Sequence, residues 1–390
     1  MTKNNVFDKK IMRSMKLLAF IGLTAILLFG IVAVNKTIQH SVLDFFETVE
    51  KKGSDFEFYT LLQNSNTERS KQMQWFAKNK YYKDSVLNPP HILLGAHDDD
   101  AEKNFGSIFR LEQKLETTFP LIQIYVPWGS RREQKFPVTR VKNIINKGSL
   151  PLITWEPWLQ RFESRKYPQL RSAGERNEGG MADIANGLYD EYILEWAREI
   201  KKIKVPIFIR WGHEMNDAYR YAWGPQNNKS YEYIHAWRHL HKLFTEQNVD
   251  NVIWVWCPHI SYLDYDEYYP GHEYVDYIGM NILNYGEAVS WAGWLSFSEL
   301  FDKHYTHFSY YDKPIMIAEF ATLKYGGDKN QWYAEALDSF PQKYPMVKSL
   351  LFFHVSEDNT TSLNSLDWQF IDDSVCTSII SEKINQWKDF

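Results

Sequence analysis

From about residue 90 onward, the chain alternates eight strand-like apolar runs with amphipathic runs, and this count constrains the fold most strongly. The expected strands are His91–Ala96, Leu121–Val126, Leu150–Trp155, Val205–Trp211, Asn251–Cys257, Tyr277–Ile282, Pro314–Glu319 and Leu350–His354. The expected helices are Arg110–Thr117, Val138–Lys147, Ala182–Lys202, Ser230–Gln247, Phe297–Tyr305 and Trp332–Phe340. Alternating strands and helices indicate parallel βα units. Eight such units predict an α/β protein with a closed (β/α)8 TIM barrel.

Two of the expected strands end at a single glutamate. The run V-P-I-F-I-R-W leads through Gly212 into His213, Glu214 and Asn216, and K-P-I-M-I-A-E-F-A carries Glu319. Since the C-terminal ends of barrel strands open onto one face, we expect these carboxylates to meet there. One carboxyl as general acid/base and another as nucleophile, about 5–5.5 Å apart, are what retaining glycoside hydrolysis requires. The strand ends therefore predict a glycosidase site.

The loops after the strands are expected to add polar and aromatic groups to this face. The chain is 16% aromatic and contains 15 Trp. Tryptophan presents a flat apolar face to sugar C–H groups and an N–H donor at its rim. The candidates for contact with substrate are His213, Arg210, Trp155, Glu156, Trp158, Asn216, Trp223, Tyr285 and Trp368.

Charge and cysteine usage argue against other classes of protein. The net charge is -5 and no basic block follows the N-terminal region, which argues against a nucleic-acid partner. No metal or cofactor is expected, because the zinc motif H-E-x-x-H would need histidine where Asp217 stands. Cys257 and Cys376 are the two cysteines, and Cys257 lies in an apolar strand, as a buried thiol would.

The N-terminal region predicts a membrane anchor. Leu17–Val34 is an uncharged apolar run that approaches the length of a membrane-spanning helix. Lysines and an arginine precede it, so the N-terminus is expected in the cytoplasm and the rest outside. The alternative is a cleaved signal sequence, followed by secretion. The expected organisation is a basic tail at 1–16, the anchor at 17–34, a juxtamembrane spacer at 35–85 and the catalytic domain at 86–390.

Five sequence stretches together resemble glycoside hydrolase family 26, the β-mannanase and lichenase family of retaining clan A barrels. They are P-L-I-T-W-E-P-W, R-W-G-H-E-M-N, Y-Y-P-G-H-E-Y-V-D-Y-I-G, K-P-I-M-I-A-E-F-A and a late D-W, within about residues 90–375. The resemblance implies that Glu214 is the acid/base and Glu319 the nucleophile. His213 takes the place of the asparagine that most other clan A families keep before the acid/base.

This sequence also departs from the family pattern. Asp217 and A-Y-R-Y-A-W-G follow the acid/base motif where the family often has Gly and W-Y-P-W, which leaves Trp223 as the expected sugar platform. Leu283 stands where many members have a tyrosine after the sixth strand, and Tyr285 is the candidate to replace it. These departures concern the residues that would bind the sugar and leave both glutamates in place.

The expected reaction is hydrolysis of internal β-1,4-type linkages, with β-mannan as the leading substrate. Glu214 is expected to start protonated, with its pKa raised by an apolar setting and by Glu319. Arg210, His213 or Tyr285 is expected to keep Glu319 ionised. A mixed-linkage β-glucanase, a hydrolase that trims the cell's own exopolysaccharide beside its synthesis complex, and a catalytically silent carbohydrate-binding module remain alternatives.

Overall fold

The computed structural model describes residues 69, 71–98, 105–359 and 365–387. In this part of the chain, eight parallel strands close into one barrel in sequence order, with the first strand paired to the eighth. The predicted TIM barrel is therefore confirmed. The strands are β1 (Leu93–Asp98), β2 (Leu121–Pro127), β3 (Leu150–Glu156), β4 (Ile207–Trp211), β5 (Val252–Trp256), β6 (Tyr277–Asn284), β7 (Ile315–Thr322) and β8 (Val347–His354).

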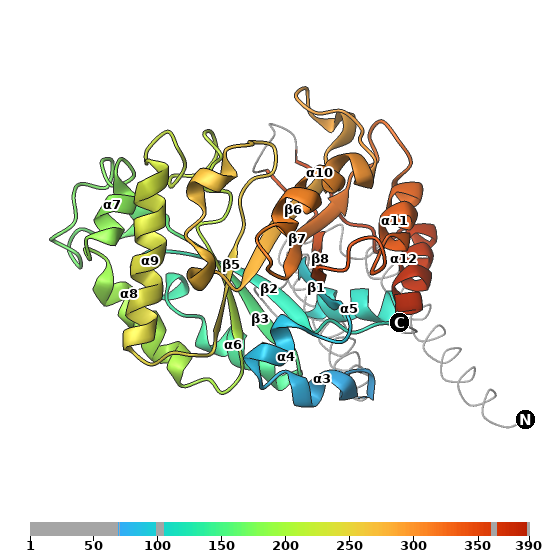
Figure 1. Cartoon of the computed structure of the whole chain (residues 1–390), viewed down its shortest axis with the longest axis horizontal. Coiled ribbons are helices and arrows are strands. Elements are labelled where there is room, and N and C mark those ends of the chain that lie inside the picture. The colour runs from blue at the N-terminus through green and yellow to red at the C-terminus, as the bar shows by residue number, and fades with distance from the viewer. Residues whose placement is uncertain (1–68, 70, 99–104, 360–364, 388–390) are drawn as a thin grey trace, which may run out of the picture. The chain divides into compact units, whose positions relative to one another are not determined.

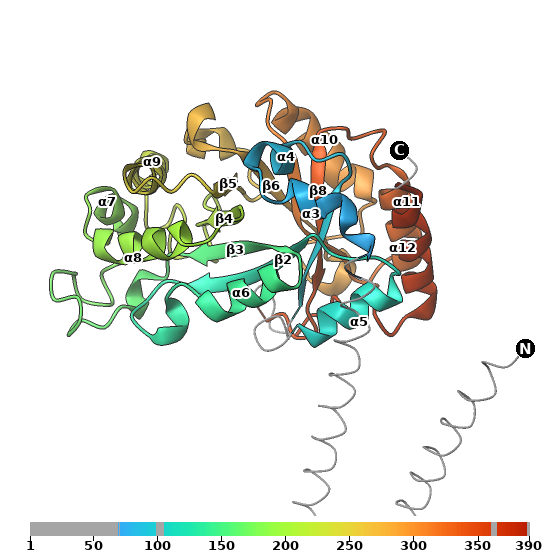
Figure 2. The ribbon, with the colours of Figure 1, turned by 90° about the horizontal axis from the view of Figure 1, so that it is seen from below.

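Helices lie outside the strands (Figure 1). Both views place α8 and α9 at one side of the barrel and α11 and α12 at another (Figure 2). The α-helices are α3 (Gln74–Asn79), α4 (Lys83–Leu87), α5 (Gly106–Lys114), α6 (Val138–Asn146), α7 (Gly180–Ala185), α8 (Asp190–Lys201), α9 (Ser230–Glu246), α10 (Phe297–Ser309), α11 (Lys329–Asp338) and α12 (Ser374–Gln386). Short 3-10 turns are η2 (Arg132–Gln134), η3 (Leu159–Arg161), η4 (Tyr265–Tyr268), η5 (His272–Tyr274) and η6 (Gly286–Ala288).

The expected helix over Ala182–Lys202 is two helices, so that prediction is wrong in its continuity. The chain breaks between α7 and α8 at Gly187, which has a φ of +87°. This left-handed conformation suits glycine and ends a helix. Helix α12 was not expected, although it packs against α11 and its Cys376 and Ile380 are buried in the core between helices and barrel.

Residues 69 and 71–87 belong to the packed unit that contains the barrel. Met73, Phe76 and Val86 are buried in the cluster that fills the barrel interior. The Lys83 ammonium donates to the Val252 carbonyl and pairs with Asp276 at 2.9 Å. The described part of the expected spacer is therefore a cover over the N-terminal ends of the strands.

The predicted anchor over 17–34 lies outside the described residues. Within the described residues, the search for an apolar helix of membrane-spanning length finds none. Cys257 and Cys376 are both buried free thiols, as the apolar context of Cys257 predicted.

Side chains alternate between the barrel interior and the layer under the helices. In β4, Phe208 belongs to the interior cluster, whereas Ile207 and Ile209 pack toward the helices. This period of two is the ordinary geometry of a strand. Arg210 therefore points into the barrel, where it is fully buried.

Candidate active site

Glu319 points into the barrel because strand β7 is irregular at that position. Ala318 lies in the interior cluster and Phe320 in the outer one, which leaves no regular alternation for the residue between them. The pairing of β7 with β8 shifts register between Ile317 and Phe320. Bulges of this kind re-aim a side chain beside an active site. Here the irregularity places Glu319 on the interior side.

The Glu319 carboxylate is bound by two interior side chains from other strands. Its Oε1 accepts from Arg210 Nη2 at 2.7 Å and from the Tyr125 hydroxyl at 2.5 Å. Arg210 also donates to Tyr125 Oη at 2.9 Å and to Thr154 Oγ1 at 2.9 Å. A hydrogen bond from a guanidinium to a carboxylate is short and stronger than one between neutral groups. The sequence patterns did not indicate Tyr125, although it shares the parity of the interior residue Leu121 on β2.

Glu214 lies in a strained turn directly after β4. Its φ of +52° is rare for a residue with a side chain, and Gly212 before it has a φ of +50°. The Glu214 amide donates to the Cys257 carbonyl at 2.7 Å, which fixes the turn to the end of β5. Backbone strain of this type is concentrated at functional sites. The turn presents the Glu214 side chain at the C-terminal mouth of the barrel.

Two hydrogen-bonded side chains connect Glu214 with Glu319. Asn281 donates from Nδ2 to Glu214 Oε1 at 2.8 Å, and its Oδ1 accepts from Arg210 Nη1 at 2.8 Å. Arg210 then reaches Glu319 through its other terminal nitrogen. In the sheet, Asn281 is also the backbone neighbour of Glu319. The structure therefore brings the two predicted carboxylates to one network at one end of the barrel.

The expectation that Glu214 starts protonated is wrong for the empty site. Burial alone would raise the pKa of Glu214, but the positive charge of Arg220, then the nearby His259, and the Asn281 hydrogen bond lower it well below the usual range. Arg220 Nη2 lies 2.8 Å from Glu214 Oε2. The sequence did not single out Arg220, which comes six residues after the glutamate on the same loop.

Glu156, at the end of β3, is a further carboxyl of this face. It is partly exposed, and its Oε2 accepts from Trp158 Nε1 at 3.2 Å. Burial raises the pKa of Glu156 to about 7, because the Trp158 hydrogen bond and the more distant charge of Arg210 do not offset the loss of hydration. Glu156 and Trp158 are thus accessible to a ligand, and their contact with substrate stays a prediction.

Four of the expected substrate contacts have other roles. Trp155 is 0% exposed and stacks on Trp196 with ring centroids 4.3 Å apart, since odd positions of β3 face the helices. Trp223 and Trp368 are also buried, and their indole nitrogens donate to the His213 carbonyl and to Asp358 Oδ2. Sugar contact is therefore wrong for these three indoles. The Asn216 amide binds backbone groups of His259 and Tyr262, so it holds the loop after β5.

His213 supports the loop after β4, and Tyr285 lies at the rim, where its predicted contact with Glu319 stays a prediction. His213 is buried, and its Nε2 lies 3.1 Å from the Tyr221 hydroxyl. Burial and then the charge of Arg210 lower the pKa of His213 well below its usual value, so its ring is neutral. Tyr285 packs between Trp291 and Trp368, with ring centroids 4.9 and 5.0 Å away. Trp291 itself is 61% exposed, which makes it an available aromatic face.

Glu214, Asp217 and His259 place three possible metal-ligand atoms within 4.8 Å of one another. The Arg220 guanidinium already binds both carboxylates of this set, through Nη2 to Glu214 and through Nε to Asp217. A cation is thus supplied by the chain itself. The donor set fits an arginine clamp better than a metal.

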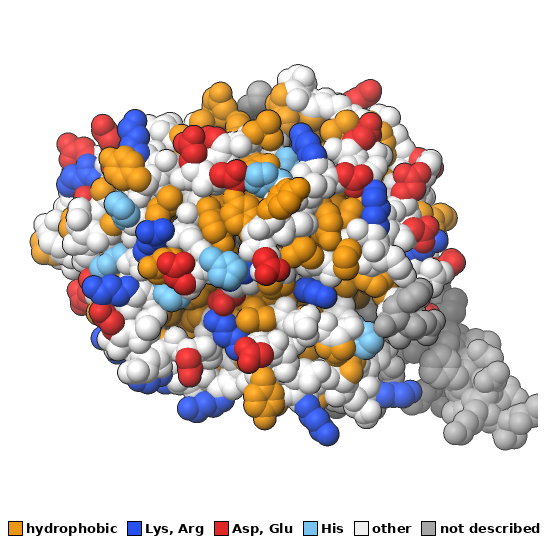
Figure 3. All heavy atoms as spheres, in the orientation of Figure 1, with side chains coloured by type: hydrophobic (Ala, Val, Ile, Leu, Met, Phe, Trp, Pro, Cys, Tyr) orange, Lys and Arg blue, Asp and Glu red, His pale blue; other side chains and the backbone are white. Residues whose placement is uncertain are grey.

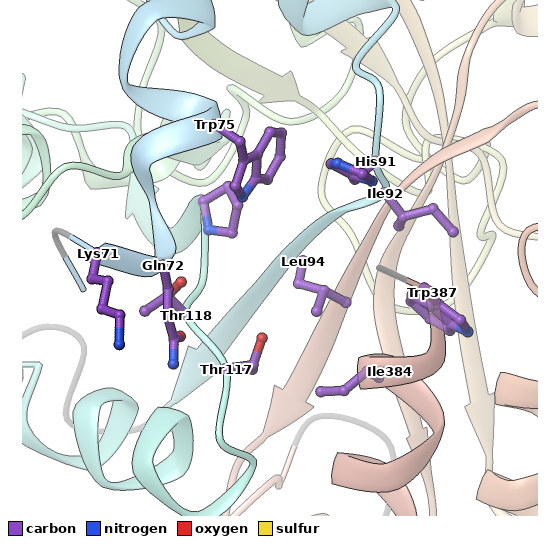
Figure 4. Close-up of a pocket in the computed structure, with 11 residues that line it drawn as sticks. Lys71, Gln72, Trp75, His91, Ile92, Leu94, Thr117, Thr118, Ile384 and Trp387 are labelled. Carbon is purple, nitrogen blue, oxygen red and sulfur yellow. The ribbon is translucent and has the colours of Figure 1, made fainter. Parts of the chain in front are cut away.

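A separate cavity of about 480 Å³ lies at the N-terminal ends of β1 and β2, beside α3 and α12 (Figure 4). Its described lining has no carboxylate and consists of Lys71, Gln72, Trp75, His91, Ile92, Leu94, Thr117, Thr118, Pro120, Ile384 and Trp387. Because Glu214 and Glu319 lie at the opposite ends of the strands, this cavity is not the glycosidase site. The face in Figure 3 intermixes acidic, basic and hydrophobic side chains and shows no broad basic surface.

Residues 162–308 match the family model described as Glycosyl hydrolase family 26. Endoglucanase H of Acetivibrio thermocellus is 34% identical over 233 residues, which cover 57% of this chain and 23% of that protein. A mannan endo-1,4-beta-mannosidase of Bacillus subtilis (strain 168) is 25% identical over 198 residues, covering 49% of this chain and 48% of that protein. The chain thus spans less than half the length of these relatives.

Solved structures share the fold. A GH26 β-mannanase from Bacteroides ovatus superposes with a TM-score of 0.55 at 15% identity, over 81% of this chain and 94% of that one. A Bacillus subtilis mannanase gives 0.51 at 15% identity, over 78% and 90%. Glu214 lies inside the segment that matches the family model, and Glu319 lies eleven residues beyond its end. Residues 162–308 are thus similar to glycosyl hydrolase family 26, and the solved structures show that the fold is shared.

Proposed function

We propose that this chain is a retaining endo-β-glycanase that cleaves β-1,4-type linkages, with β-mannan as its preferred polysaccharide. The observation that carries the proposal is the continuous network Glu214–Asn281–Arg210–Glu319 at the C-terminal mouth of the barrel. It gives one carboxylate a permanent positive partner inside the barrel and places the other on a loop at the mouth. These are the two groups that a retaining glycosidase uses.

The reaction proceeds in two displacements. Glu319 attacks the anomeric carbon while Glu214, in its acid form, protonates the departing glycosidic oxygen, so that the C–O bond breaks and a glycosyl ester forms. Glu214 then removes a proton from water, and the resulting hydroxide displaces Glu319 from the anomeric carbon. Arg210 and Tyr125 donate to the Glu319 carboxylate and hold it in place for the attack.

The rim supports a polysaccharide rather than a small glycoside. Trp158 and Tyr285 are partly exposed, and Trp291 is largely exposed beside Tyr285. Aromatic faces of this kind bind the apolar faces of sugar rings. Glu156 adds a hydrogen-bonding carboxyl, protonated below about pH 7. Several such contacts along a chain of sugars favour internal cleavage.

β-Mannan is preferred because three of the similar curated proteins carry the name mannan endo-1,4-beta-mannosidase. A β-glucanase of the lichenase type is the second candidate, since the relative with 34% identity is named Endoglucanase H. A catalytically silent carbohydrate-binding module is disfavoured, because both carboxylates and their charged partners are in place.

The test is product analysis with the full chain on β-mannan, mixed-linkage β-glucan and the host's own exopolysaccharide. Mannan should release a ladder of oligosaccharides whose new reducing ends first appear in the β-configuration by proton NMR. Faster hydrolysis of mixed-linkage glucan would select the second candidate. The α-anomer as first product would contradict retention, and no products from any polymer, with sugar binding intact, would select the binding module.

We also propose that Leu17–Val34 anchors the enzyme in the membrane with the barrel outside the cytoplasm. The uncharged run and the lysines before it support this orientation. An anchored enzyme would act on polymer made at its own cell surface, beside a polysaccharide synthesis complex. Carbonate-resistant pelleting with membranes, together with protease sensitivity from outside, is expected. Recovery of the chain in the medium, cleaved after residue 34, would support secretion instead.

A further inference from the structure

Arg220 donates a hydrogen bond to the Glu214 oxygen that would have to carry the proton of the acid form. Asn281 donates to Glu214 Oε1, and Arg220 donates to Glu214 Oε2. A guanidinium has donors only, so it cannot accept a proton from a carboxylic acid. With both oxygens bound to donors, Glu214 is suited to the base step and unsuited to the acid step.

The loop that carries Arg220 provides a second anion for it. Asp217 Oδ2 accepts from Arg220 Nε, and Asp217 Oδ1 accepts from the amides of Tyr219 and Arg220. Arg220 therefore has a partner to keep if its Nη2 leaves Glu214. Its side chain is 20% exposed, against 0% for Arg210, so a ligand can reach the one arginine and not the other.

Resting on the proposed glycosidase function, we propose that Arg220 is a mobile positioning residue: it binds Glu214 before substrate binds and withdraws to Asp217 when the leaving-group sugar contacts Glu214. Withdrawal removes a positive charge from Glu214 and frees Oε2 to carry the proton that the glycosidic oxygen receives. After the leaving sugar departs, Arg220 returns and favours the carboxylate that activates water.

Other titratable or charged groups around Glu214 also influence its pKa. His259 Nε2 lies 4.0 Å from Glu214 Oε1, and neutral His213 precedes Glu214 in the chain. The remaining titratable or charged groups that face this pair are Asp217, Tyr221, Cys257, Tyr262 and Tyr285. Arg220 is the group that makes direct charged contact with Oε2, so its removal should dominate any change.

The experiment compares pH profiles of the full-length wild type and R220Q on the polymer that the wild type hydrolyses. Because the general acid must be protonated, kcat/KM falls as pH rises through the pKa of Glu214 in the free enzyme. Loss of a neighbouring positive charge raises a carboxyl pKa by about 1–3 units. The alkaline limb of kcat/KM should therefore move up by about that amount in R220Q. The limb of kcat, which reports the substrate complex, should move less.

Three further variants test the charge and the partner exchange. R220K keeps the charge, so its limb should stay nearer to that of the wild type. D217N removes the negative charge to which Arg220 would withdraw, so Arg220 should stay on Glu214. The alkaline limb of kcat/KM should then move to lower pH, the opposite direction from R220Q. R171Q is the matched control, because it removes another arginine–carboxylate ion pair, with Asp183, at a different loop. It should leave both limbs in place.

An unchanged kcat/KM limb in R220Q would overturn the proposal, as would an equal shift of both limbs, since Arg220 would then stay on Glu214 in the complex. If the wild type hydrolyses no polymer, the proposed function fails and the clamp is tested alone. Carbon-13 NMR titration of labelled glutamate carboxyls, with Glu214 assigned by E214Q, should show the same rise in R220Q. If R220Q does not fold, the downward shift in D217N decides the question.

Discussion

The two carboxylates of the site are held by different kinds of partner. Glu319 is bound by Arg210 and Tyr125, which stand on β4 and β2 and point into the closed barrel. Glu214 is bound by Asn281 of β6 and by Arg220 of the loop after β4. The arginine on Glu319 is fully buried, whereas the arginine on Glu214 is partly exposed.

This difference matches the difference in chemical task. A nucleophile must present the same ionised oxygen at the start of every cycle, so partners on rigid strands serve it. An acid/base has to gain and lose a proton within each cycle, and a partner that cannot move would hold it in one state. The comparison predicts that substitutions at Glu319 and its strand partners remove catalysis. Substitutions at Arg220 and its loop should instead change the pH dependence of the rate.

The largest expected effect is that of Glu319→Ala. Without the nucleophile, turnover should fall roughly 10⁴-fold or more, as it does when a catalytic nucleophile is removed from other hydrolases. Initial rates of reducing-sugar release measure the loss, and thermal unfolding checks the fold. Glu335→Ala, at an exposed glutamate of α11, is the control and should retain the wild-type rate. Full activity in E319A would remove Glu319 from the mechanism.

Glu214→Ala should have a smaller effect that depends on the leaving group. General acid catalysis contributes about 10²–10⁴-fold, and an aryl glycoside with an acidic phenol needs little of it. The loss in kcat/KM should therefore be large on polysaccharide and slight on such a glycoside. Added azide should restore turnover of the aryl substrate by replacing base-activated water. Equal losses on both substrates would show that Glu214 does not donate the proton.

The barrel and both carboxylates could be predicted from sequence because their signals are local. Each strand is a short apolar run, and each glutamate lies within or shortly after one. The prediction that Trp155 contacts sugar is wrong because side chains alternate along β3. Trp155 faces the helices, and Glu156, the next residue, faces the mouth of the barrel. The same parity, applied to β2, would have found Tyr125.

Other parts of the site could not be read from the sequence. Glu319 depends on an irregularity in the register of β7, and a bulge leaves no mark in a single apolar run. Arg220 lies in a loop whose path decides which carboxylate it meets. The raised pKa expected for Glu214 followed from its apolar neighbours, and one arginine from that loop reverses the direction. Long-range charge contacts are set by tertiary structure.

Tyr125→Phe tests whether Glu319 depends on the Tyr125 hydroxyl as well as on Arg210. The change removes the hydroxyl that donates to Glu319 and accepts from Arg210. A hydrogen bond to a charged group is worth about 1.5–3 kcal/mol, or roughly 10–100-fold in kcat/KM if it is fully expressed in the transition state. Tyr233→Phe is the matched control, since its hydroxyl contacts a backbone carbonyl under α9. If the two variants behave alike, Tyr125 has no special role.

Glu156→Gln should give the smallest effect, and it appears in stability rather than in rate. Glu156 has no arginine in direct contact, and its pKa rises from 4.5 to about 7. Between these values the folded state binds the proton more tightly than the unfolded state does, so wild-type stability falls as pH rises. The glutamine variant lacks this loss. Its melting temperature should therefore gain on the wild type between pH 5 and 8, by about 2–4 °C per kcal/mol.

Thermal unfolding of both proteins across that pH range measures the difference between their melting temperatures. The contributions of all other titrating groups are the same in both proteins and cancel in this difference. A constant difference would mean that Glu156 is ionised throughout, with the charge of Arg210 sufficient for it at a distance. The outcome bears on the other two glutamates. If burial without an arginine in contact keeps a carboxyl at this mouth protonated up to neutral pH, then Glu214 needs only the withdrawal of Arg220 to become an acid.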